Sequence, residues 1–226
     1  WIIVGDFYFQ PSELTKLFLL IFFAAILAQN RQSLNSYKFF IFICILFLIP
    51  ITLILSEPDL STSIVIFIMF CVIIFIGGIA SRILRTVVLI VIPVLAMVIA
   101  LIIILPADRN IIPKYQYNRL IGFYDPDNEA AENIRYQQEN SILAIAGGSL
   151  TGKGLNNNSI TTVKNADFIS EPQTDFIFTI IGEELGFAGS LVTIVLLALI
   201  VIECFRIGLR ARENIGKCIA FGYGTL

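Results

Sequence analysis

The sequence contains no histidine, and charged residues make up only 14% of its 226 residues. The lack of histidine excludes Ser-His-Asp triads, histidine proton shuttles and histidine-bearing zinc sites. Any acid-base chemistry must therefore use Asp, Glu, Lys or Tyr. A net charge of −2, without a long basic run, also argues against nucleic acid as a partner.

Cysteine is scarce as well, and no two cysteines form a CxxC pair. The four are Cys44, Cys71, Cys204 and Cys218. Each lies in or beside an apolar run, where cysteine behaves as a small hydrophobic residue of a helix. The sequence therefore predicts neither a disulfide nor a metal cluster.

Apolar residues, in contrast, are in large excess, at 57% of the chain with a mean hydropathy of +0.87. A water-soluble domain of this length could not bury so much apolar surface, which predicts a membrane protein. Five runs are long enough for membrane helices of about 20 residues. They cover residues 14–28, 39–55, 60–80, 87–106 and 176–202. The predicted fold class is an all-α polytopic membrane protein.

The two ends of the sequence indicate that the chain is part of a longer protein. The chain begins at Trp1, without an initiator Met or the charged start of a signal peptide, and stops at Leu226 in a newly begun apolar stretch. We therefore expect a fragment of a single, longer membrane domain.

Basic residues gather in the short connections between these runs. They are Arg31, Lys38, Arg82, Arg85, Arg206, Arg210, Arg212 and Lys217. The positive-inside rule places these connections in the cytoplasm. The opposite, extracytoplasmic side then holds residues 1–12, the turn at 57–59 and one long connection, 107–175. Its length predicts a functional or disordered segment. Its mixed composition favours a folded lid with an amphipathic helix near 130–146.

Several polar groups on the outer side are candidates for chemistry, because ionisable residues near membrane depth are costly. Glu13 and Lys16 are three residues apart and so share one helical face. They could serve a substrate or only neutralise each other at a helix start, where Ser12 could be a plain N-cap. Glu57 and Asp59 flank Pro58, and a solvent-facing turn is the favoured interpretation there.

Residues 147–153 read GxxxxGK, the first part of a phosphate-binding P-loop. Gly154 stands where the motif needs Ser or Thr, and no strand precedes it, so nucleotide binding is not predicted. A loop rich in backbone amides, with Lys153, could still receive a pyrophosphate, although a flexible hinge is the simpler interpretation.

Asp175 ends the long connection and begins the last apolar run, so a straight helix would place its carboxylate at the membrane surface. Glu183 and Glu184 would lie about 12 Å deeper at 1.5 Å per residue. One of them could line a polar cavity and the other could seal a helix contact. Capping of the helix by Thr174 or Asp175 is the simpler alternative for the start of the run.

These motifs together resemble the SEDS family of bacterial membrane proteins, the FtsW/RodA/SpoVE group. The matching stretches are Trp1 with residues 9–16 (FQPSELTK), 57–60 (EPDL) with Thr62 and Ser63, Asp125 and Pro126, 136–138 (YQQ) with Ser141, 152–154 (GKG), and 174–178 (TDFIF) with 183–186 (EELG). They follow the family's order along the whole chain. Each stretch is weak alone, but together they make a specific signal.

The resemblance implies a ten-helix fold of which this chain is the middle, and a peptidoglycan glycosyltransferase that polymerises lipid II. It implies Asp175 as the essential carboxylate, a functionally sensitive Trp1, and Glu13 and Lys16 in a central polar cavity. It also implies a class B penicillin-binding protein as partner, with other divisome or elongasome membrane proteins, in the bacterial cytoplasmic membrane with the active site facing outward. Two departures are the absence of the histidine that often precedes the Thr-Asp pair, and Ser61 in place of glycine.

From these arguments we expect Asp175 to act as the base for the acceptor hydroxyl, with cations balancing the departing pyrophosphate. The expected substrate-binding residues are Trp1, Glu13, Lys16, Arg119, Lys153 and Glu171. No cofactor is firmly expected, and a divalent cation, Mg²⁺ or Mn²⁺, stays open. A lipid II flippase or transporter and a non-catalytic scaffold for the penicillin-binding protein are the alternatives.

Overall fold

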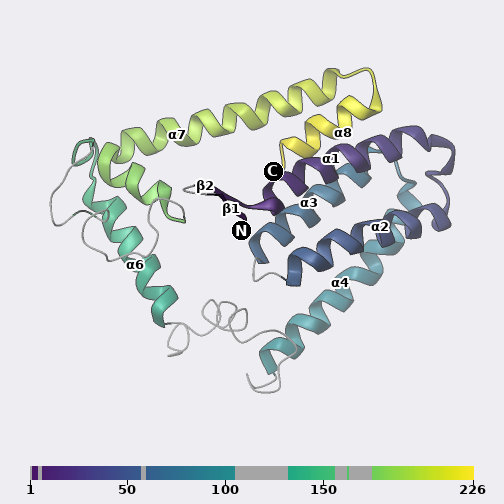
Figure 1. The fold of residues 1–226 in the computed structure, drawn as a ribbon, viewed down its shortest axis with the longest axis horizontal. Helices are drawn as coiled ribbons and strands as arrows, with labels where there is room; N and C mark the ends of the chain where they lie inside the picture. Colours follow the sequence, from purple (N-terminus) through teal and green to yellow (C-terminus); the bar gives the residue numbers. More distant parts are fainter. Residues whose placement is uncertain (1, 5–6, 57–59, 105–131, 156–161, 163–174) are drawn as a thin grey trace. The chain divides into compact units, whose positions relative to one another are not determined.

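The structure is a computed structural model, which describes residues 2–4, 7–56, 60–104, 132–155, 162 and 175–226 (Figure 1). The chain forms two compact units. Unit 1 comprises Trp1–Val98 and Leu199–Leu226, and unit 2 comprises Ile99–Ala198.

Unit 1 is built from helices, preceded by one short hairpin. Strands β1 (Ile2–Val4) and β2 (Phe7–Phe9) pair antiparallel, with Ile3 opposite Tyr8. The helical elements are α1 (Pro11–Gln29), the 3-10 turn η1 (Arg31–Ser33), α2 (Tyr37–Ser56), α3 (Leu60–Ile76), α4 (Ser81–Ile104), which continues into unit 2, the end of α7 (Ile177–Arg210), and α8 (Asn214–Tyr223).

The predicted fold class, an all-α polytopic membrane protein, is confirmed. Helices occupy all five apolar runs, and α1, α2 and α7 are long and apolar enough to cross a membrane. Helix α3 is equally apolar but shorter. The hairpin at the start of the chain was not predicted, because strands of three residues are too short to give an alternating pattern.

Aromatic and small side chains join the helices of unit 1. Phe70 of α3 stacks on Phe47 of α2, with ring centroids 3.8 Å apart, and meets Phe23 of α1 edge-on at 5.0 Å. Helix α8 packs against both α1 and α3, and Gly222 lies directly against Leu20 and Ile73. Close approach at a small residue is the usual way in which membrane helices gain dispersion energy.

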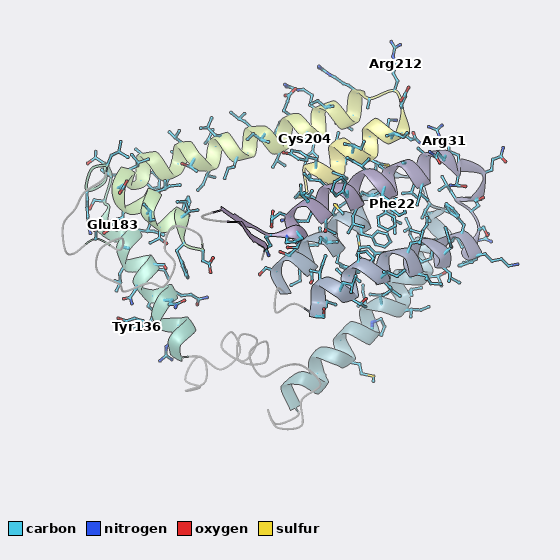
Figure 2. All side chains as sticks on the ribbon, in the orientation of Figure 1. Phe22, Arg31, Tyr136, Glu183, Cys204 and Arg212 are labelled. Atoms are coloured by element: carbon cyan, nitrogen blue, oxygen red, sulfur yellow. The ribbon has the colours of Figure 1, made fainter. Side chains whose placement is uncertain are left out.

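Charge distinguishes the two ends of unit 1. Arg31 follows α1 and Arg212 joins α7 to α8, and Figure 2 shows both at the same end of this unit. The starts of α2 and α4, with Lys38, Arg82 and Arg85 nearby, also belong to this end, because the helices alternate in direction. The start of α1, with its acidic and hydroxyl side chains, lies at the other end.

Unit 2 contains α6 (Glu132–Gly147), residues 148–155 and most of α7. Helix α6 confirms the prediction of a helix near 130–146, but its polar and apolar residues separate along its length and not between two faces, so it is not amphipathic as predicted. Its first half is polar and its second half is apolar, ending in a Gly-Gly pair that starts the turn into residues 148–155.

Helix α7 is not one straight span, as had been expected for residues 176–202. Gly186 has φ 67° and ψ −163°, which is not helical, and the parts before and after it run in different directions (Figure 1). We call residues 177–185 the first segment and 187–210 the long segment. The long segment alone exceeds the about 20 residues that a membrane span needs. The break lies beyond Glu183 and Glu184, so their spacing along the helix from its start is kept, and their depth in the membrane stays a prediction.

Candidate functional site

The start of α1 holds one predicted pair together. Lys16 Nζ lies 2.7 Å from Glu13 Oε1, and the Lys16 side chain is 18% exposed whereas that of Glu13 is 57% exposed. The three-residue spacing places both side chains on one face of the helix, as the sequence predicted. A half-buried cation thus stands at the end of unit 1 opposite the basic connections.

Ser12 is not the N-cap of this helix. Helix α1 begins one residue earlier, at Pro11, whose fixed φ and missing N–H suit the first helical position. Ser12 is instead inside the helix and buried, and its Oγ has no hydrogen-bond partner among the described residues. A buried hydroxyl of this kind normally has a partner, so it marks the inner side of the Glu13–Lys16 turn as a place where a polar group could be received.

Asp175 stands two residues before α7, in a turn, and is exposed. Among the described residues, its carboxylate takes part in no hydrogen bond or ion pair. The next residue, Phe176, packs on the buried Ala144 of α6, and its carbonyl accepts the first hydrogen bonds of the helix, from the amides of Thr179 and Ile180. The carboxylate is therefore open to a ligand while the residue beside it is fixed.

Glu183 is buried, with only 3% of its side chain exposed, on the first segment of α7 (Figure 2). Lys153 Nζ lies 2.6 Å from Glu183 Oε1 and donates a hydrogen bond to it. The carboxylate thus seals a contact between α7 and the turn after α6. Glu184, its neighbour, is only partly buried.

The turn after α6 pairs with α7 through the backbone as well. The amides of Lys153 and Gly154 donate to the carbonyls of Glu183 and Glu184, at 2.9 and 3.1 Å. In return, the amides of Phe187 and Ala188 donate to the carbonyls of Ser149 and Leu150, at 2.8 and 3.2 Å. These carbonyls and amides are the ones that the break at Gly186 removes from the helical hydrogen-bond pattern.

This pairing changes the interpretation of the GxxxxGK sequence. The amides of Lys153 and Gly154, which could have bound a pyrophosphate, donate hydrogen bonds to carbonyls of α7 instead. The turn is therefore bound to α7 and is not a flexible hinge. Two glycines of the turn permit the close approach: the Cβ position of Gly148 points at the carbonyl of Gly182, and that of Gly152, at φ 80°, points at the carbonyl of Glu184. We call residues 144–154 and 176–188 together the α6–α7 clasp.

Other predicted site residues lie outside the described part of the chain. They are Trp1, Arg119 and Glu171, together with the turn residues Glu57 and Asp59. Within the described ranges, the structure brings Glu13 to Lys16 in unit 1 and Lys153 to Glu183 in unit 2. No three His, Cys, Asp or Glu side chains of the described residues converge as metal ligands, so a divalent cation stays an expectation.

Lys153 and Glu183 were predicted as separate candidates, and their pairing was not predicted from the sequence. A signal for the pair was present, since a carboxylate in an apolar helix needs a counter-charge. Lys153 is one of few basic residues of the long connection, but it lies thirty positions away, and no spacing rule links the two.

Comparison with known proteins identifies the family of the chain. All of residues 1–226 match the FtsW/RodA/SpoVE family of cell cycle proteins. The chain belongs to this family. Among SEDS relatives, it is 35% identical over 209 residues to the probable peptidoglycan glycosyltransferase FtsW of Haemophilus influenzae, covering 92% of this chain and 49% of that protein. It is 31% identical over 212 residues to the protein of the same name from Taylorella equigenitalis, covering 93% and 54%.

A solved structure has the same fold. It comes from work described as structural coordination of polymerization and crosslinking by a peptidoglycan synthase complex, and it matches with a TM-score of 0.65 at 22% identity. The match covers 99% of this chain and 57% of the solved chain. The chain thus spans about half the length of the relatives that it matches.

Proposed function

We propose that the whole protein is a peptidoglycan glycosyltransferase that polymerises lipid II at the outer face of the bacterial cytoplasmic membrane. The observation that carries the proposal is the match of the entire chain to the SEDS family, with relatives named as probable peptidoglycan glycosyltransferases. The gathering of basic residues at one end of unit 1 supports a cytoplasmic position for that end.

In the proposed reaction, the 4-hydroxyl of the acceptor sugar attacks C1 of the lipid-linked glycan. The C1–oxygen bond to the undecaprenyl pyrophosphate breaks, and the pyrophosphate leaves with the electron pair. Asp175 accepts the proton of the attacking hydroxyl. An exposed carboxylate, which no described residue engages, supports this role, because a base must be within reach of the substrate proton.

The departing pyrophosphate needs positive charge. Lys16 supports this need best among the described residues, because its side chain is half-buried and lies one helical turn from the buried Ser12 hydroxyl. Trp1 is proposed on the resemblance, Arg119 and Glu171 are proposed as charged residues of the long connection, and Glu13 would orient Lys16. A divalent cation could share the phosphate charge, but no step of the proposal depends on it.

A class B penicillin-binding protein is the proposed partner. Its support is the likeness of fold to a chain from a peptidoglycan synthase complex in which polymerisation and crosslinking are coordinated. Such a partner would crosslink the glycan as it emerges. The resemblance extends this proposal to other membrane proteins of the divisome or elongasome.

The test is polymerisation of purified lipid II by the whole protein in detergent, with and without its partner. We expect long glycan from the wild type and none from Asp175→Asn, with both proteins eluting as folded single species. Wild-type rates from Asp175→Asn would overturn the assignment of the base. A transporter would make no glycan in detergent, and a scaffold would tolerate Asp175→Asn while remaining able to bind the penicillin-binding protein.

A further inference from the structure

The segment that follows Asp175 is held in place by residues that do not touch Asp175. We infer that Lys153 and Glu183 form a positioning pair for the reaction: by holding the α6–α7 clasp closed, they fix where the Asp175 carboxylate stands. This inference rests on the proposed function, in which Asp175 is the base. It assigns Lys153 a role beside a carboxylate rather than on the pyrophosphate.

The break at Gly186 makes such a device necessary. A continuous helix would fix the direction of its first residues through its own hydrogen bonds. At Gly186 the backbone leaves the helical region, so helical geometry no longer relates the first segment to the long segment. The direction of the first segment, and with it the place of Asp175, must be set by what packs against it.

Helix α6 and the turn after it supply that packing. Phe176 lies on Ala144, and a Cβ added at Gly182 would stand only 3.0–3.3 Å from the side chain of Ile145, so the two helices approach closely at this glycine. The buried face of α7 continues through Thr179, Glu183 and Gly186, at the three- and four-residue spacing of one helical face. The first segment thus touches its support along its length, from the residue after Asp175 to the break.

The four backbone hydrogen bonds make the clasp and the break depend on each other. Glu183 and Glu184 each offer a carbonyl to the turn, and Phe187 and Ala188 each offer an amide to it. Unpaired backbone groups are costly in apolar surroundings. Moving the turn away from α7 would break all four backbone hydrogen bonds at once, so we expect the clasp to open or close as a whole.

The ion pair locks this arrangement. The Glu183 carboxylate is nearly fully buried, whereas the Lys153 side chain reaches it from a position that is 30% exposed. Removing the lysine charge leaves a buried carboxylate without that cation, which favours movement of the turn and entry of water. Glu183 lies about 9 Å along the first segment from Ile177, and Asp175 stands two residues before Ile177. The pair therefore acts on Asp175 through the segment and not by contact.

The test uses the whole protein with its partner and purified lipid II in detergent. Lys153→Met should lower kcat about tenfold or more, because small displacements of a catalytic group are costly, while KM for lipid II changes by less than about threefold. Lys153→Arg, which keeps the charge, should stay within about threefold of wild type. Lys153→Met combined with Glu183→Gln removes the buried charge and should recover most of the lost kcat. Arg135→Met is the control, since Arg135 pairs on the surface of α6 with Glu139 at 3.7 Å.

Hydrogen exchange followed by mass spectrometry gives a readout that is independent of activity. Exchange in residues 176–190 should be faster in Lys153→Met and return toward wild type in the double variant. Unchanged exchange in Lys153→Met overturns the inference, and so does a double variant that is as slow as Lys153→Met, because the lysine would then act on the substrate. Failure of the wild-type protein to make glycan overturns the proposed function instead.

Discussion

The backbone of Gly186 in α7 lies directly against the backbone of Gly152 in the turn after α6. A Cβ at Gly186 would meet the Gly152 nitrogen and would stand 2.8 Å from the Leu150 carbonyl oxygen. In addition, φ 67° with ψ −163° is a conformation that essentially only glycine adopts. A side chain at this position would therefore meet both a steric collision and backbone strain.

Gly186→Ala should therefore destabilise the protein by about 1–3 kcal/mol from backbone strain alone, with a further cost from the collision. Thermal unfolding of the whole protein in detergent measures the effect as a lower Tm. Gly216→Ala on α8 is the matched control, because its Cβ would meet only Ala211 at 3.5 Å. There the change should be neutral or stabilising by about 0.5–1 kcal/mol. An unchanged Tm for Gly186→Ala would contradict the break.

Phe70→Ala should be among the most damaging truncations in unit 1. Phe70 stacks on Phe47 and meets Phe23 edge-on, so its removal empties the space between three helices. The expected cost approaches the about 3–5 kcal/mol of buried aromatic truncations. Phe75→Ala on the same helix is the control, since Phe75 is 69% exposed. Chemical denaturation in detergent compares the two, and equal losses would argue against this cluster as the centre of the packing.

Gly222→Val should push α8 away from α1 and α3. The added carbon would collide with Leu20 and stand 3.2 Å from Cγ1 of Ile73, and both neighbours are buried. Overpacking of this kind costs about 1–3 kcal/mol. Gly216→Val adds the same side chain to the same helix where space is open, and it should unfold at close to the wild-type temperature. Indistinguishable melting curves for the two variants would refute the close packing of α8.

Lys16→Gln should separate activity from stability. Its ion pair with Glu13 spans three residues on one helix, so its loss should change stability by less than about 1 kcal/mol. Polymerisation of lipid II should nevertheless fall by about tenfold or more, because the cation that we propose for the leaving group is lost.

The matched control for Lys16→Gln is Arg206→Gln, which breaks another pair of the same spacing, to Glu203 at 3.0 Å, at the basic end of unit 1. We expect that variant to retain wild-type polymerisation and stability. Equal activity of the two glutamine variants would show that Lys16 has no part in the reaction.

The sequence alone determined the fold class, the places of the helices in the five apolar runs and the difference between the two ends of unit 1. It could do so because apolar runs and charges act locally: a run of about 20 apolar residues has no alternative to a membrane helix, and basic residues mark its end. The same local rules predicted the Glu13–Lys16 pair, since one turn of helix joins its members.

Only the tertiary structure decided how α7 is broken and what Lys153 holds. Gly186 lies in a stretch that is typical of a continuous helix, and its conformation is imposed by hydrogen bonds to the turn at residues 149–154, far earlier in the chain. The burial of Glu183 and its pairing with Lys153 follow from that docking. Such contacts depend on which backbone groups meet in the folded protein. Hydrophobic periodicity and residue spacing describe only neighbours along the chain, so they do not predict these contacts.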